Sequence, residues 1–292
     1  MKIPVNQFIS SFFCSFSQIM LQKSSVTGLL FVVGIGLNSP IMLLGATIAV
    51  LSALLVAQFF KYDSDSINTG LYGFNAALVG SAVFFFFPAN IFSFTLVILV
   101  GAISTVIMHF MLLKLLDLPV FTVPFLVSTW LLLQLSEILP IETIAIDSKA
   151  IPLTANAFDD FYAVMRGVGQ VLFQGYWFSG VVFIAGLLLH SYKIAVWAIV
   201  GSVGGVIVAS AFNFPEDSVH QGLYGFNASL SAIALAPRFS KTFSKKRWPI
   251  FIGIVISILL TRAFEVLAIP ALTAPFVLAS WIVIFLVRVD ST

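Results

Sequence analysis

Long apolar runs separated by short polar segments dominate the chain. Examples are "IMLLGATIAVLSALLVA" at 41–57, "FTLVILVGAISTVIMHFMLLKLL" at 94–116 and "IAVWAIVGSVGGVIVASAF" at 194–212. A helix needs roughly 20 apolar residues to cross the hydrocarbon of a bilayer, and the runs leave room for about ten crossings. Strands of a membrane barrel would alternate apolar and polar residues, and these runs do not. The pattern therefore predicts an all-α polytopic membrane protein.

The first segment of the chain has a different pattern. Ile9, Phe12, Phe13 and Phe16 follow helical spacing, with Ser and Gln on the other side. This favours an amphipathic or half-buried helix over a cleaved signal, whose apolar region would be continuous.

Composition narrows the function. Of the 292 residues, 60% are hydrophobic and 9% are charged, and the net charge of +2 gives no reason to expect a nucleic-acid partner. The single cysteine, Cys14, excludes an internal disulfide and any CxxC motif. No motif points to a metal or another cofactor.

Three motifs occur twice in the same order. "GLYGFNA" stands at 70–76 and 222–228, "LPVFTVPFLVSTW" at 118–130 matches "IPALTAPFVLASW" at 269–281, and "SQIMLQ" at 17–22 matches "GQVLFQ" at 169–174. The offsets are 152, 151 and 152 residues. Such duplication is typical of transporter and channel folds. It predicts a first repeat over 1–140, a linker over 141–159 and a second repeat over 160–292.

Loop charge predicts that the repeats are inverted. "PRFSKTFSKKRWP" holds five Lys or Arg between Arg238 and Arg247, and its counterpart "FPANIFSFTL" holds none. Basic residues in short loops stay on the cytoplasmic side. If equivalent loops lie on opposite faces of the membrane, only one of them should be basic.

The proline motif predicts a break in a helix. Two prolines five residues apart cannot lie inside an unbroken helix, because each lacks an N–H and disfavours helix in the residue before it. Broken backbone at membrane depth is tolerated where it lines a cavity or packs in protein. Thr122 and Thr273 lie within the two breaks. Their hydroxyls either face such a cavity or only patch the broken helix ends.

The glycine motif and the glutamine motif offer further candidates. Phe74 and Phe226 precede apolar runs, where a lone Phe is normally a packing residue. Asn75 and Asn227 are expected to satisfy backbone groups at a helix start. Gln18 and Gln170, at equivalent positions of apolar helices, either face water or bond between helices. None of these motifs contains a charged side chain, so the lining they predict suits a small, neutral, hydrogen-bonding solute.

Together, "GLYGFNAALVG" with "LPVFTVPF" and "GLYGFNASLSA" with "IPALTAPF" resemble the duplicated signature of the urea transporter family. The resemblance covers essentially the whole chain. It implies two inverted halves of five helices, each with a half-spanning pore helix, in a homotrimer with one passive urea path per protomer. A single inner or plasma membrane is the expected location.

The resemblance also assigns residues. The family's aromatic slot falls on Phe74 and Phe226, backed by Leu78 and Leu230. Its pore threonines fall on Thr122 and Thr273, and its polar pair at the pore mouths on Gln18 and Gln170. The aromatic residue three places on is Phe173 in the second half, but Leu21 stands there in the first.

Three rival functions have weaker support. An ion-coupled transporter would need an intramembrane carboxylate; Asp117, Glu137 and Glu265 are candidates, although Arg262 makes a helix-surface pair with Glu265 the plainer interpretation. An ammonium channel would be expected to carry histidines at equivalent positions of the two halves, but His109 aligns with Thr261. A membrane enzyme would need a catalytic motif, and neither HExxH nor GxSxG is present.

Overall fold

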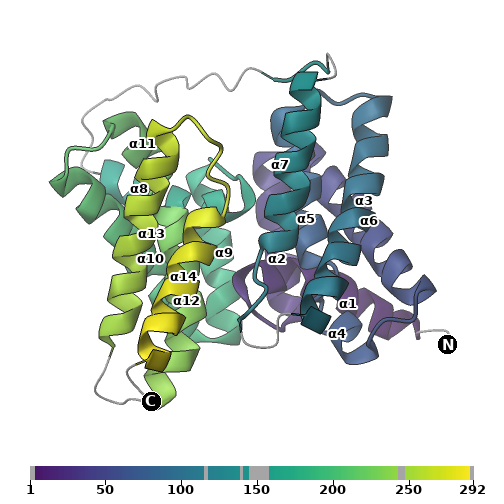
Figure 1. Ribbon diagram of the computed structural model, residues 1–292, viewed down its shortest axis with the longest axis horizontal. Helices are drawn as coiled ribbons and strands as arrows, with labels where there is room; N and C mark the ends of the chain where they lie inside the picture. The colour runs from purple at the N-terminus through teal and green to yellow at the C-terminus, as the bar shows by residue number, and fades with distance from the viewer. Residues whose placement is uncertain (1–3, 115–117, 139–140, 145–157, 243–246, 290–292) are drawn as a thin grey trace. The chain divides into compact units, whose positions relative to one another are not determined.

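The computed structural model describes residues 4–114, 118–138, 141–144, 158–242 and 247–289. Within these ranges the chain is helical, with connecting turns and no β-strand, in agreement with the predicted all-α class. It divides into two compact units, Met1–Asp147 and Ser148–Thr292. Each unit is described by itself (Figure 1).

The described residues of the first unit form seven α-helices and one short 3-10 helix. They are α1 (Val5–Ser17), η1 (Gln18–Met20), α2 (Ser25–Asn38), α3 (Pro40–Phe59), α4 (Ser64–Asn68), α5 (Phe74–Phe86), α6 (Ile91–Lys114) and α7 (Val123–Ile138).

The second unit repeats this order of elements. They are α8 (Asp159–Gly169), η2 (Gln170–Leu172), α9 (Trp177–His190), α10 (Tyr192–Ala211), α11 (Glu216–His220), α12 (Gly225–Thr242), α13 (Trp248–Val266) and α14 (Ala274–Val289). The glycine motif leads into α5 and α12, and the proline motif leads into α7 and α14.

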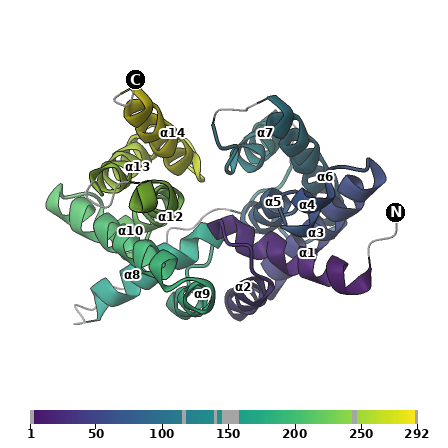
Figure 2. The ribbon, with the colours of Figure 1, turned by 90° about the horizontal axis from the view of Figure 1, so that it is seen from below.

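One helix forms the centre of each unit. In the first unit α5 packs against α1, α3, α6 and α7 (Figure 2). All but one of its residues are buried. In the second unit α12 packs against α8, α10, α13 and α14. The sequence of α5, FNAALVGSAVFFF, carries no charged residue on any side, as suits a helix in such a position.

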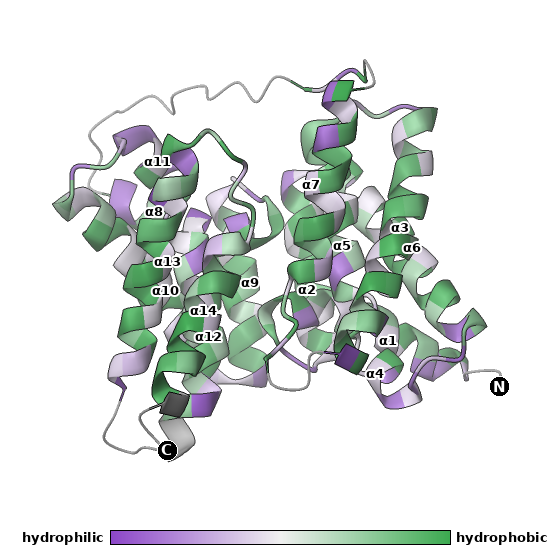
Figure 3. Ribbon diagram, in the orientation of Figure 1, coloured by the Kyte–Doolittle hydropathy of each residue, from purple (hydrophilic) through white to green (hydrophobic). Residues whose placement is uncertain are grey.

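Among the helices that the structure describes, four are long and apolar enough to cross a membrane: Pro40–Phe59, Ile91–Lys114, Tyr192–Ala211 and Trp248–Val266. Hydrophobic residues run along them (Figure 3), and large ones such as Leu55 and Leu99 point outward, 61% and 53% exposed. Two bent helix pairs raise the number of candidate spans to six. Three shorter apolar helices, Phe74–Phe86, Val123–Ile138 and Ala274–Val287, add to this apolar length. The expected number of about ten crossings stays a prediction.

The two bent pairs have the same geometry. The segments Val5–Met20 and Ser25–Asn38 meet at 75°, and Asp159–Leu172 and Trp177–His190 also meet at 75°. At each bend one residue is left-handed, Leu21 with φ 58° and Phe173 with φ 60°. The N–H of the next residue bonds back five positions, from Gln22 to the Ser17 carbonyl at 3.0 Å and from Gln174 to the Gly169 carbonyl at 3.1 Å. This 6→1 bond ends the helix and turns the chain.

The first helix forms as expected, but it buries its small polar side. Ser11, Ser15 and Ser17 are fully buried, whereas Ile9 is 48% exposed. Small residues let two backbones approach closely in a membrane protein. Gly70, with φ 79°, lies so close to α1 that a Cβ added to it would be 2.4 Å from the Cys14 carbonyl carbon.

Candidate functional site

Both proline motifs interrupt the helical chain, as predicted. The described backbone resumes its helix only at Val123 in the first unit and at Ala274 in the second. The residue two places before each helix start is left-handed, Phe121 with φ 48° and Leu272 with φ 46°. The second proline of each motif, Pro124 or Pro275, lies in the first turn, where a missing N–H leaves no bond unmade.

In the first unit, Asn75 joins the glycine motif to this break. Its side-chain oxygen accepts the N–H of Phe125 at 3.1 Å, and its amide nitrogen donates to the Phe121 carbonyl at 3.4 Å. That N–H belongs to the first turn of α7, where no carbonyl of the same helix can accept it. Asn75 is completely buried, so it satisfies two backbone groups that water does not reach.

Asn227 makes the same two bonds in the second unit. Its oxygen accepts the N–H of Phe276 at 3.2 Å, and its amide nitrogen donates to the Leu272 carbonyl at 3.1 Å. The expectation that the two asparagines satisfy backbone groups at a helix start is confirmed. The helix is the one after the proline motif, however, and not the one that the asparagine itself begins.

Thr122 and Thr273 immediately precede α7 and α14. The Thr122 carbonyl accepts the N–H of Leu126 at 3.0 Å, and the Thr273 carbonyl accepts that of Val277 at 3.2 Å. Each threonine is buried, 2% and 3% exposed. Each stands between the two backbone groups bound by the asparagine, so its position is fixed from both sides.

The predicted aromatic slot residues lie at the start of the central helices. Phe74 and Leu78 are one turn apart on α5, and Phe226 and Leu230 are one turn apart on α12. Phe74, Leu78 and Leu230 are buried, and Phe226 is half-buried. Each unit thus presents a Phe and a Leu beside its own Asn and its own proline break.

The two glutamines lie at the bends and differ in their contacts. Gln170 donates from Nε2 to the Gln221 carbonyl at 3.1 Å, directly before the second glycine motif. The Nε2 of Gln18 is buried and has no hydrogen-bond partner among the described residues. Phe173 and Leu21 are the left-handed residues at the bends.

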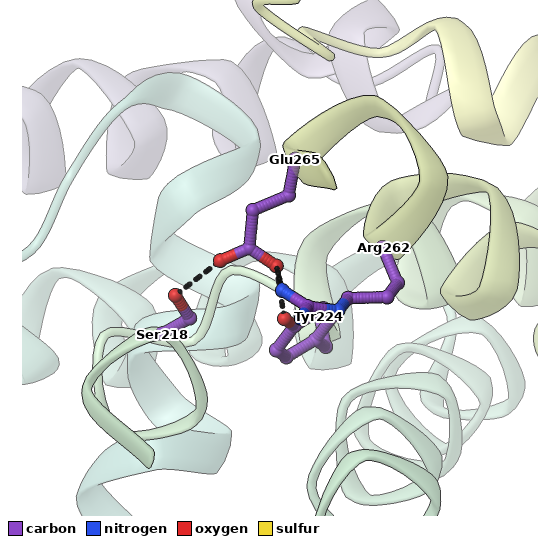
Figure 4. Close-up of polar contacts among 4 residues, drawn as sticks. All are labelled: Ser218, Tyr224, Arg262 and Glu265. Carbon is purple, nitrogen blue, oxygen red and sulfur yellow. Dashed lines mark hydrogen bonds and ion pairs between the residues drawn. The ribbon is translucent and has the colours of Figure 1, made fainter. Parts of the chain in front are cut away.

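Sequence reasoning missed the contacts of the tyrosine in each glycine motif. In the second unit, Tyr224 donates from its hydroxyl to Glu265, which also pairs with Arg262 at 2.7 Å and accepts the Ser218 hydroxyl at 2.8 Å (Figure 4). Burial and the nearby Glu265 carboxylate raise the pKa of Tyr224. The expected helix-surface pair of Arg262 and Glu265 is present, but it also holds the loop before α12.

In the first unit, the tyrosine of the glycine motif, Tyr72, contacts a histidine. The hydroxyl of Tyr72 lies 3.1 Å from His109 Nδ1, and Tyr62 stacks flat on the His109 ring at 3.7 Å. Burial raises the pKa of Tyr72 to about 12, so its hydroxyl stays protonated at neutral pH. The position of Tyr62 corresponds to Phe214, over which Arg262 lies at 5.5 Å. We call Tyr62, Tyr72 and His109 the first clamp, and Ser218, Tyr224, Arg262 and Glu265 the second clamp.

A family model described as "Urea transporter" matches residues 9–288. The chain belongs to the urea transporter family. Among curated proteins, it is 25% identical to Urea transporter 1 of Ovis aries, an alignment that covers 96% of this chain and 77% of that protein. It is 30% identical to Urea transporter 1 of Mus musculus over 82% of this chain and 65% of that protein. The resemblance expected from the motifs is confirmed.

Membership of the urea transporter family makes the chain a multi-pass membrane transporter rather than an enzyme. Of the carboxylates considered for ion coupling, Glu265 is bound by Arg262 and Tyr224, and Asp117 lies outside the described residues.

Proposed function

We propose that this urea transporter family member conducts urea passively, as a channel, down its concentration gradient. The observation that carries the proposal is the repeated break. Each unit fixes a threonine between two backbone groups held by one asparagine, next to a Phe and a Leu. None of these side chains is charged, which suits a neutral solute better than a bare ion.

Urea is planar and neutral, with N–H donors in its plane and weakly polar faces. Flat Phe surfaces at 74 and 226 fit those faces, and the hydroxyls of Thr122 and Thr273 replace hydrogen bonds that urea loses when it leaves water. The same logic of replacing hydration applies to the filters of ion channels. Gln18, Gln170 and Phe173 are proposed to meet the solute at the two mouths of the path.

The membrane topology is part of the proposal. We place the chain in a cell inner or plasma membrane as a homotrimer, with its two repeats inserted in opposite orientations. The opposite orientation is supported by the basic segment from Arg238 to Arg247, of which Lys245 and Lys246 lie outside the described residues. The homotrimer is what the resemblance to the family implies. Labelling of single cysteines in a Cys14→Ser background, from each side of the membrane, tests the orientation. Labelling of 88–94 and 238–247 from the same face would rule out inversion.

Stopped-flow shrinkage of liposomes that carry the purified protein tests conduction directly. We expect urea flux that does not change when proton or sodium gradients are imposed. Flux that requires either gradient would establish a coupled transporter, and flux of ammonium without urea would establish the ammonium channel.

Thr→Val variants at 122 and 273 test the role of the hydroxyls, because valine keeps the shape but not the hydrogen bond. Loss of one neutral hydrogen bond, worth roughly 0.5–1.5 kcal/mol, should slow flux about 2- to 13-fold per site. Normal flux with a lowered thermal midpoint would leave the threonines only a role in capping the helices.

A further inference from the structure

A second pair of buried hydroxyls follows the pore threonines, one in each unit. Thr129 on α7 and Ser280 on α14 occupy equivalent positions, offset by 151 residues. Thr129 is 1% exposed and Ser280 is fully buried. Neither hydroxyl oxygen has a hydrogen-bond partner among the described residues.

Several other buried hydroxyls in the described helices have a partner in their own helix. A buried Ser or Thr inside a helix commonly donates to the carbonyl four residues earlier. Thr105 does so to Gly101 at 3.1 Å, and Thr261 does so to Ser257 at 2.8 Å. A buried hydroxyl without a partner is costly, so its presence at equivalent points of both units points to a bound solute as the partner.

Helix geometry puts the two hydroxyls in line with the pore threonines. Thr129 is seven residues after Thr122, and Ser280 is seven residues after Thr273. Each pore threonine directly precedes its helix, and seven residues make almost two turns. Thr129 and Ser280 therefore lie on the face of α7 and α14 that continues from the threonine, roughly 10 Å further along the axis. The same face therefore offers a first hydroxyl at the break and a second one deeper along the helix.

The neighbouring central helices carry unpaired hydroxyls as well. Ser81 on α5 and Ser231 on α12 are fully buried and have no hydrogen-bond partner among the described residues. In the second unit, Ser231 follows Asn227 by four residues and Ser280 follows Phe276 by four. Because Asn227 bonds to Phe276, the two serines lie one turn beyond the same contact.

We propose that Thr129 and Ser280 are further solute-binding residues of the conduction path, which contact urea two helical turns beyond Thr122 and Thr273. The inference rests on the proposed urea conduction. A hydroxyl donates to the urea oxygen or accepts a urea N–H, so one residue type serves either orientation of the solute. Ser81 and Ser231 would extend the same polar path from the neighbouring helix.

Thr129→Val and Ser280→Ala remove these hydroxyls with little change of shape. Ser128→Ala is the matched control: Ser128 is also buried and unpaired, but it points about 100° away around α7, and its equivalent in the second unit is already Ala279. The measurements are liposome urea flux and the thermal midpoint of the purified protein. We expect flux about 2- to 13-fold lower in Thr129→Val and in Ser280→Ala, with an unchanged midpoint and normal flux in Ser128→Ala.

The pair Thr129→Ser and Thr129→Ala covers the case in which valine disturbs packing. Both lack the methyl group, so faster flux in the serine variant isolates the hydroxyl. Normal flux in both Thr129→Val and Ser280→Ala would overturn the inference, as would equal slowing by Ser128→Ala. Absence of urea flux in liposomes that carry the wild-type protein would instead refute the proposed function itself.

Discussion

The two units hold the same backbone arrangement with different chemistry around it. The asparagine bonds are nearly identical, at 3.1 and 3.2 Å to the N–H groups of Phe125 and Phe276. The aromatic neighbours also match: the ring centroids of Tyr62 and Tyr72 are 5.1 Å apart, and those of Phe214 and Tyr224 are 5.2 Å apart. The hydroxyl of the tyrosine, however, meets a histidine in the first clamp and a carboxylate with its arginine in the second.

This difference separates two kinds of requirement. The asparagine bonds satisfy particular backbone groups at a fixed break, and few side chains offer both a donor and an acceptor in that space. The clamps only have to hold a tyrosine hydroxyl, which many partners can do. Identical contacts in both units therefore mark the geometry that the break requires.

Replacement of either asparagine by leucine should have the largest effect. Asn75→Leu or Asn227→Leu strands a buried N–H and a buried carbonyl, at about 1–3 kcal/mol each. We expect similarly large drops in the thermal midpoint for both variants, because the contacts are alike. Asn→Ala, which strands the same two groups without the added bulk of leucine, is the control. A large drop in only one unit would break the comparison.

The second prediction concerns the residues that pack against the second glycine of the glycine motif, which differ in size between the two units. Gly73 faces the Ser15 hydroxyl, whereas Gly225 faces that of Ser202. Ser15 corresponds to Gly167, and Val50 corresponds to Ser202.

Gly167→Ser alone should therefore overpack the second unit by about 1–3 kcal/mol, because its Cβ would lie 2.1 Å from the Ser202 hydroxyl. Addition of Ser202→Val copies the first unit and should restore part of the loss. A double-mutant cycle on thermal midpoints measures this coupling. Additive effects would show that the two positions do not compensate each other.

The third prediction compares the clamps directly. Tyr224→Phe removes a hydrogen bond to a charged group, worth about 1.5–3 kcal/mol, and Tyr72→Phe removes a neutral one, worth about 0.5–1.5 kcal/mol. We expect the larger fall in midpoint for Tyr224→Phe. Tyr62→Phe, which keeps the stacked ring on His109, is the control. An equal fall in both clamps would mean that the carboxylate adds no strength.

The smallest effect concerns the short helices before the glycine motifs. Asp63 caps α4 by accepting the Ser66 N–H at 2.8 Å, whereas α11 follows Pro215 and has no side-chain cap. Hydrogen bonds from Ser66 hold the pKa of Asp63 below its usual value. A lowered folded-state pKa means that the cap stabilises α4 above the unfolded-state pKa, near 4, and loses this effect as the pH falls through the folded value.

Hydrogen exchange of 64–68 should therefore accelerate in acid beyond the intrinsic rate, and Asp63→Asn should abolish that change. Exchange of 216–220 serves as the internal control and should be the same in both proteins. Persistent acid sensitivity in Asp63→Asn would assign it to another carboxylate.

Much of the fold could be predicted from the sequence because its determinants are local. Two prolines five residues apart, at 119 and 124 and again at 270 and 275, cannot both lie inside one unbroken helix, and apolar runs of about 20 residues identify membrane helices. The bends at Leu21 and Phe173 were not predicted, because a non-glycine residue in the left-handed region leaves no sequence signal of the kind that glycine gives.

The candidate site was predictable only in part. The asparagines were expected to meet a helix start, but their true partners lie 50 and 49 residues further along the chain. The buried face of α1 was missed because serines count as polar, although Ser11 and Ser15 have the spacing of a close helix contact. For the two clamps, the sequence shows only that Tyr72 and Tyr224 belong to the repeated motif. The residues that contact the two tyrosines cannot be predicted from sequence spacing.

The asparagine bonds also constrain how the protein is made. Asn75 leaves the ribosome 46 residues before Phe121 and 50 before Phe125, the partners of its side chain. Until the proline motif follows it, its amide has to be kept in contact with water or with the insertion machinery. All three residues lie within the first unit, Met1–Asp147, so these bonds can close before synthesis of the second unit is complete. Asn227 is likewise made before its partners, Leu272 and Phe276. Each repeat therefore contains all the residues that form its own break, and it can form these bonds as it is translated.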